Sequence, residues 1–211
     1  KFAMLTGVTK FGKVSVFSDL NNLKDISLDN RYYNLCGIDE GELHGVFEPY
    51  VQRLADSQNI TLDKAYSELK RNYDGYHFSK NMVGMYNPFS LLNAFDSLEI
   101  GSYWFETGTP SYLVELLKRH DFKLDELKGN KVTANVLSAI DASSSNPISV
   151  IFQSGYLTIS GYNERYKLYS LDFPNEEVRE GFMLYLMPYY TSVSVNKTGF
   201  QISCFVEEVK S

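Results

Sequence analysis

The chain has 211 residues and a formal net charge of −6, and aromatic side chains make up 15% of it. This acidic balance argues against broad, salt-dependent nucleic-acid binding, although a local basic patch is compatible with it. No run approaches the roughly 18 apolar residues of a membrane span, and Cys36 and Cys204 share no spacing motif. We therefore expect a cytoplasmic protein with reduced core thiols and no membrane partner.

The chain opens with an apolar stretch, Phe2 to Gly7, that predicts a buried strand followed by a polar turn. In α/β nucleotide-binding sheets, ligands bind outside the carboxyl ends of the strands. Thr6, Gly7 and Lys10 are therefore candidate ligand-contacting residues. A simple turn with a solvated lysine is the alternative.

Residues 7–13 also match the Gly-x4-Gly-Lys part of a phosphate-binding loop. Such a loop needs Ser or Thr directly after the lysine to reach the magnesium ion, and Val14 stands there. Ser15 comes one residue later, about 100° further round a helix, so it does not substitute. The pattern favours a chance near-match over a working loop.

Several helices are predicted from their starting signals. Asp39 and Glu42 have the spacing of a capping box, and Pro49 is expected to kink or split the apolar run that follows. Further helix starts are predicted at Thr61, Asn87-Pro88, Thr109-Pro110 and Phe173–Glu177.

The last third of the chain has a different pattern. Two short strands are predicted, Tyr156 to Ile159 and Tyr166 to Leu171, joined by a glycine-containing loop from Gly161 to Arg165. Helices followed by a hairpin and a further helix indicate a winged-helix-like unit. The predicted fold class is mainly α with a small β component.

Other chemistry-bearing residues have ordinary structural interpretations. His44, His77 and His120 lie on separate elements without metal-site spacing, so structural or solvated histidines are favoured. Glu208 and Lys210 have the spacing of the end of a nuclease carboxylate-lysine motif, but no well-placed carboxylate precedes them, which favours an exposed helix face.

Aromatic residues near the middle of the chain form a cluster, Tyr73, Tyr76 and Phe78. They are able to stack on a base or a partner, but packing between helices is favoured. The predicted hairpin loop carries one arginine and one glutamate, Arg165 and Glu164, which is thin electrostatic support for DNA binding.

Together these segments resemble a known family, the predicted AAA-ATPase-like proteins abundant in gut Bacteroidetes and some Firmicutes. The resemblance runs from about residue 2 to residue 190, through several long motifs in order. The matching motifs are Leu5–Phe11, Leu20–Ser27, Tyr73–Phe78, Tyr86–Leu92, Tyr103–Pro110, Gln153–Ile159 and Phe173–Arg179.

The resemblance implies that this chain is a fragment, because the family's Walker A and Walker B segments lie upstream and a restriction-endonuclease-like nuclease domain commonly lies downstream. By this resemblance, residues 1–12 are the terminal strand and turn of an incomplete ATPase core, and residues 13–146 a helical lid-like region. Residues 147–190 are then the winged-helix-like unit and 191–211 a connector toward the missing C-terminal domain.

The resemblance also assigns roles. Thr6 is placed near the terminal phosphate, with Gly7 and Lys10 as sensor-like cofactor-binding residues, and the fragment holds no complete catalytic site. ATP and magnesium are expected in the parent protein and not on this fragment. Its expected partners are the missing ATPase core and nuclease-like domain, and a homo-oligomer is an open alternative.

Two other function classes remain open. One is a protein- or DNA-binding interaction module without an ATPase role, which uses the aromatic cluster and the hairpin. The other is a metal-dependent nuclease that uses the terminal Glu208 and Lys210.

Overall fold

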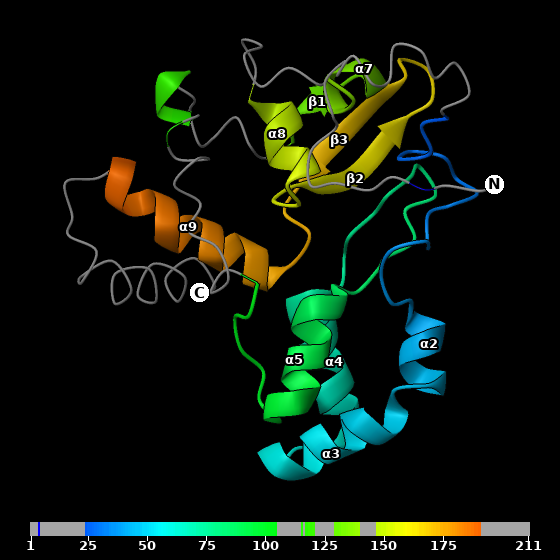
Figure 1. The fold of residues 1–211 in the computed structure, drawn as a ribbon, viewed down its shortest axis with the longest axis vertical. Helices are drawn as coiled ribbons and strands as arrows, with labels where there is room; N and C mark the ends of the chain where they lie inside the picture. The colour runs from blue at the N-terminus through cyan, green and yellow to red at the C-terminus, as the bar shows by residue number, and fades with distance from the viewer. Residues whose placement is uncertain are drawn as a thin grey trace.

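A computed structural model describes Met4 and residues 24–104, 115, 117–120, 129–139 and 147–190 (Figure 1). Of the predicted first strand only Met4 is described, and it is exposed and not in a strand. The near-match loop at residues 7–13 and the helix start at Thr109-Pro110 lie outside the described residues.

The first part of the described chain is a helical unit of four helices. They are α2 (Glu40–Gly45), α3 (Glu48–Gln58), α4 (Leu62–Tyr73) and α5 (Pro88–Ser97). Their apolar faces form one core that contains Leu43, Val51, Leu54, Leu69, Tyr73, Leu91 and Ala94, all fully buried.

The helix starts follow the local signals. The backbone N–H of Glu42 donates to Asp39 Oδ1 at 2.7 Å and the Glu42 side chain accepts from Asp39 N at 3.0 Å, which confirms the capping box. Pro49 lies in the first turn of α3, where its missing N–H costs no hydrogen bond, so the apolar run is split there as predicted. Thr61 and Asn87 cap α4 and α5 through their side-chain oxygens.

The second part is a sheet unit. It contains β1 (Lys131–Val132), α7 (Ala134–Leu137), α8 (Ile148–Gln153), β2 (Thr158–Asn163), β3 (Leu168–Asp172) and α9 (Glu176–Tyr190). The strands are antiparallel in the order β1-β3-β2. The described chain is thus mainly α with a small β component, as predicted, and the helices before the hairpin have the order expected of a winged-helix-like unit.

The sheet unit draws on residues earlier than the predicted boundary at 147. Its core includes Leu117, Val132 and Leu137, which the sequence analysis assigned to the helical region. Local patterns did not reveal this because β1 has only two residues, and their partners Ser170 and Tyr169 in β3 lie 39 and 37 residues further along the chain.

The hairpin also turns later than predicted. Gly161 was expected in the loop, but the register shifts between Ile159 and Gly161, so the glycine accommodates an irregularity inside β2. The turn instead follows Asn163, whose side chain accepts from Tyr166 N at 3.0 Å. Lys167 closes it with a φ of 53°.

Cys36 is exposed, so the expectation of a core thiol was wrong for this residue. It follows a series of turns in which Tyr32 N donates to Asp29 O and Leu35 N donates to Tyr32 O. Such turns run over the surface, and Leu35 next to the cysteine is exposed as well. Of the described helices, none has both the length and the apolar character to cross a membrane.

The segment between α4 and α5 connects the two units. Figure 1 shows that this segment leaves the helical unit, reaches the sheet and returns. Tyr76 pairs with Met85 across it, and Tyr86 pairs with Ile38. Gly75 lies at the start of this excursion with a φ of +101°, against the loop that precedes α9.

We predict that Gly75→Ala destabilises the protein strongly. A Cβ atom there would lie 2.0 Å from the carbonyl oxygen of Pro174, and the left-handed backbone alone costs a non-glycine residue about 1–3 kcal/mol. Urea unfolding measures the loss of stability. Gly45→Ala is the matched control, because a Cβ atom at Gly45 meets nothing within 4 Å. Equal stability of the two variants would contradict the prediction.

Candidate functional site

The residues predicted to contact a nucleotide, Thr6, Gly7 and Lys10, lie outside the described residues, as do Glu208 and Lys210. His44 lies on the outside of α2 and stacks on Tyr66 at 4.0 Å between ring centroids. Within the described ranges, no group of three or more His, Cys, Asp or Glu side chains gathers as metal ligands.

Five of the sequence motifs meet where the helical unit contacts the sheet unit. The centre of this contact is the side chain of Glu177, from the first turn of α9, which is 3% exposed. Its Oε1 accepts from the backbone N–H groups of Tyr103 and Trp104 at 2.7 and 2.8 Å, and its Oε2 accepts from Ser90 Oγ at 2.7 Å. We call these four residues the junction.

Opposing effects act on the Glu177 carboxyl. Burial raises its pKa, while the hydrogen bonds from Trp104, Ser90 and Tyr103 act in the lowering direction. Burial outweighs them, so the net pKa is raised. The start of α9 adds favourable helix-dipole interaction for a negative charge, and Asn175 caps that helix by accepting from Val178 N at 3.1 Å.

Aromatic rings enclose the junction. Trp104 packs against Tyr156 at 5.0 Å between centroids, and Tyr156 packs edge-on against Phe182 of α9 at 5.6 Å. The hydroxyl of Tyr73 donates to Gly101 O at 2.8 Å and accepts from Gly101 N at 3.0 Å, which holds the segment after α5 against α4. Burial raises the pKa of the Tyr73 hydroxyl, so it stays a neutral donor. Packing was the favoured interpretation of the Tyr73–Phe78 cluster, and the full burial of Tyr73 confirms it for this residue.

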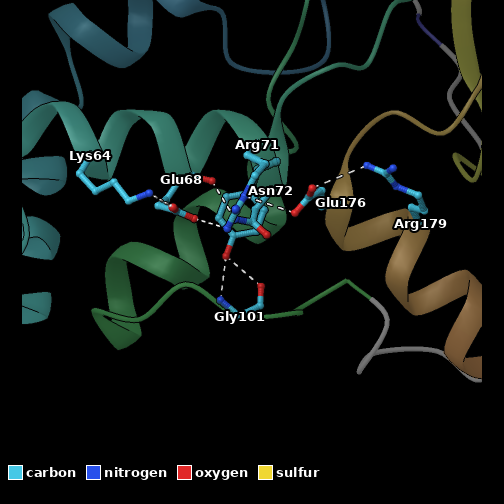
Figure 2. Close-up of polar contacts among 8 residues, drawn as sticks. Lys64, Glu68, Arg71, Asn72, Gly101, Glu176 and Arg179 are labelled. Atoms are coloured by element: carbon cyan, nitrogen blue, oxygen red, sulfur yellow. Dashed lines mark hydrogen bonds and ion pairs between the residues drawn. The ribbon is translucent and has the colours of Figure 1, made fainter. Parts of the chain in front are cut away.

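A chain of ion pairs links α4 to the start of α9 (Figure 2). Lys64 pairs with Glu68 at 2.5 Å, and Glu68 also pairs with Arg71. Arg71 Nε lies 3.2 Å from Glu176 Oε2, across the two units. These charges are half-exposed at Lys64 and Arg71, so their contribution is small beside that of the buried carboxylate.

A second contact ties the connecting segment to β2. The backbone N–H of His77 donates to Thr158 Oγ1 at 2.7 Å, and His77 Nδ1 lies 2.7 Å from Ile159 O. Because a carbonyl oxygen only accepts, Nδ1 carries the proton of this hydrogen bond. His77 is therefore a structural residue that fixes the segment on the edge of the sheet.

The Gln153–Ile159 motif also has a structural role. Gln153 Nε2 donates to the carbonyl oxygens of Leu137 and Ala139, both at 2.9 Å. These bonds hold α8 against the end of α7. Gly155 follows with a φ of +82°, and a Cβ atom there would meet Trp104 at 3.6 Å.

A smaller polar cluster lies between α2 and α4. Glu40 Oε2 accepts from Lys70 Nζ at 2.8 Å and from Tyr86 OH at 3.0 Å. Burial opposes ionisation of Glu40, but these hydrogen bonds hold its pKa below the usual range. These hydrogen bonds hold the start of α2 against α4 and Tyr86.

The junction is suited to holding two units together. Ser90 and Glu177 form a hydroxyl–carboxylate pair of the kind found in catalytic sites, but Ser90 is fully buried and no substrate reaches it. Separating the units would break all three hydrogen bonds and expose the apolar rings around them to water, while removing one partner with the contact closed would leave buried polar groups unsatisfied, which is costly. The arrangement therefore couples the units mechanically.

Sequence reasoning missed the junction. Glu176 and Glu177 both lie at the predicted helix start Phe173–Glu177, which is correct for α9 but does not distinguish them. The available signal was a pair of adjacent acids at a helix start. Of the two, only Glu177 is buried. Ser90 lies 87 residues away in the sequence, so no local pattern connects it to Glu177.

Comparison with curated proteins finds an uncharacterised protein from the vnfD 5′ region of Azotobacter chroococcum mcd 1, which is 40% identical over 208 residues. The match takes in 94% of this chain and 37% of the relative, so the chain spans little more than a third of that protein's length. No family model matches the chain, and no solved structure matches it.

We predict that Glu177→Ala destabilises the protein by about 3 kcal/mol, because it leaves three buried donors without an acceptor. Glu177→Gln is the matched variant, since it keeps the shape and the acceptor oxygen. Urea unfolding measures both. A loss for Glu177→Ala no larger than for Glu177→Gln would contradict the role of the carboxylate as an acceptor.

The raised pKa of Glu177 gives a pH prediction with a definite sign. In the folded state the carboxyl holds its proton to higher pH than in the unfolded state, so this group's contribution to stability falls as pH rises above about 4.5 toward the folded pKa. The stability of wild type relative to Glu177→Gln should therefore be greatest near pH 4 and decrease toward pH 7. An increase over that window would show that the hydrogen bonds outweigh burial.

Proposed function

We propose that this chain is the nucleotide-sensing and lid portion of an AAA-type ATPase, in which phosphate capture belongs to polypeptide outside these 211 residues. Thr6 contacts the terminal phosphate or the attacking water, with Gly7 and Lys10 beside it. The helical unit closes over the nucleotide, and the sheet unit moves with it.

The observation that carries the proposal is the junction. A lid that reports on a nucleotide must pass its movement to another part of the protein, and this requires a stiff connection. Glu177 of α9 supplies a stiff connection. Its carboxylate accepts three hydrogen bonds, one from α5 and two from the segment after α5. Its burial keeps water from competing for these bonds.

The extent of the match supports a role as one portion of a larger protein. The Azotobacter relative continues for nearly two thirds of its length outside the matched region. This length has room for an upstream ATPase core and a downstream nuclease-like domain, the partners that the resemblance implies. ATP and magnesium would be bound by that larger protein.

Thr6 has chemistry suited to a sensor. A threonine hydroxyl both donates and accepts hydrogen bonds, so it is able to contact a phosphate oxygen and orient a water at once. Lys10 adds a positive charge near the same turn, which favours a triphosphate over a diphosphate. Neither residue activates a nucleophile by itself, so turnover depends on the upstream core.

The proposal is tested with fluorescent ATP titrated onto this chain and onto the full-length parent protein, with and without magnesium. The parent is expected to bind ATP in a magnesium-dependent way, and this chain alone is expected not to. Tight magnesium-dependent binding and turnover by this chain alone would overturn the proposal. Absence of binding by the parent would overturn it as well.

We predict that Thr6→Val in the parent protein lowers the rate of ATP hydrolysis about 10- to 100-fold with a smaller effect on ATP binding, because a contact made mainly in the transition state is lost. Thr6→Ser keeps the hydroxyl and should retain most of the activity. Thr9→Val, at a neighbouring threonine, is the matched control. Equal effects at positions 6 and 9 would contradict the sensor role.

A further inference from the structure

The end of the β2–β3 hairpin carries a basic and aromatic surface. Lys80 from the connecting segment lies beside the turn residues, and the turn itself contributes Arg165, Tyr166 and Lys167. We call these four residues, together with Tyr162 and Glu164, the hairpin tip.

The charge of this region is opposite to that of the whole chain. Residues 77–82, 129–133 and 158–171, which take in the sheet except Asp172 at the end of β3 together with the segment beside it, contain four cationic side chains and one carboxylate. Three positive charges remain, against a net charge of −6 for the chain. The next acid along the hairpin, Asp172, lies at the far end of β3 from the tip.

Two aromatic rings at the tip lie beside cations. Tyr166 is 62% exposed, and the guanidinium of Arg165 lies 5.3 Å from its ring centroid. The ammonium of Lys80 lies 5.5 Å from the ring of Tyr162. Tyr162 is half-buried against Tyr169, so Tyr166 is the exposed ring of the two. An exposed ring next to positive charges is the combination with which proteins bind single-stranded nucleic acid, because bases stack on the ring while cations contact the phosphates.

Glu164 occupies the centre of the positive charges. Its carboxylate accepts from Lys80 at 3.0 Å and from Lys167 at 2.9 Å. These two hydrogen bonds hold its pKa below the usual range, so it stays ionised at neutral pH. One carboxylate thus holds two ammonium groups close together in a position where they are able to contact a phosphate.

The tip is also ordered by its own turn. The hydrogen bond from Tyr166 N to Asn163 Oδ1 and the left-handed backbone of Lys167 fix the backbone that carries the exposed ring, and the ring itself lies beside the guanidinium of Arg165. A ring that is held in place before binding loses less conformational entropy when a base stacks on it.

We propose that the hairpin tip binds single-stranded nucleic acid, with Tyr166 stacking on a base and Lys80, Arg165 and Lys167 contacting phosphates. Glu164 competes with the phosphates for the two lysines and sets the affinity low. This activity goes beyond the proposed sensing and lid function, and it does not require bound ATP.

The experiment measures fluorescence anisotropy of a labelled oligothymidylate and of a duplex of the same length, titrated with this chain at several salt concentrations. We expect binding to the single strand that weakens with salt, with a slope of log K against log salt of about −2 for three phosphate contacts. Preference for the duplex, or no binding at 50 mM salt, would overturn the proposal.

Four variants give the test its specificity. Tyr166→Ala and Arg165→Ala should each weaken single-strand binding about tenfold, while Tyr166→Phe keeps the ring and the affinity. Glu164→Gln should strengthen binding several-fold, because it releases Lys80 and Lys167 to the phosphates. Lys64→Ala on α4 is the control and should change nothing.

The outcomes separate this proposal from the ATPase proposal. Unchanged binding in both Tyr166→Ala and Glu164→Gln would overturn the role of the tip, whatever the parent protein does with ATP. Conversely, Thr6→Val leaves the tip intact, so single-strand binding should persist in that variant even where ATP hydrolysis is lost.

Discussion

The buried carboxylate of Glu177 is the contact on which the arrangement of the two units depends. An ionised group in the protein interior is tolerated only when hydrogen bonds replace the water it has lost. Here two backbone N–H groups and one hydroxyl replace part of that water, although burial still raises the pKa of the carboxyl, and all three come from α5 and the segment that follows it. The acceptor belongs to α9 of the sheet unit. Neither unit satisfies these polar groups alone, so the junction forms only when both are folded and in place.

The apolar surroundings make this contact stronger. Trp104, Tyr156 and Phe182 form a continuous series of rings beside the carboxylate, and Phe173 extends it with a centroid distance of 5.2 Å to Phe182. Each aromatic pair contributes about 0.5–1.5 kcal/mol beyond the area it buries. The rings also exclude water, which lowers the local dielectric and strengthens each hydrogen bond to the carboxylate. Packing and hydrogen bonding at the junction therefore support each other.

Features that depend on neighbouring residues were predictable from the sequence, and features that depend on distant ones were not. The capping box at Asp39 and the split at Pro49 are properties of four or five consecutive residues, and both are present. The end of the hairpin was misplaced because Gly161 suits either a turn or a β-irregularity, and pairing with β3 decides between them. Glu176 and Glu177 have the same local context, yet the side chain of Glu176 faces Arg71 near the surface while that of Glu177 is buried.

The connecting segment between α4 and α5 links the junction to the hairpin tip through a few residues. Tyr73 at its start contacts Gly101, and His77 is fixed to the beginning of β2 through Thr158 and Ile159. Three residues further on, Lys80 pairs with Glu164 at the other end of the same strand. A ligand that draws Lys80 away from Glu164 therefore acts on a segment whose beginning is held in the core of the helical unit. This covalent continuity, over eight residues, is a physical route by which the proposed binding at the tip and the proposed closure of the lid would influence each other.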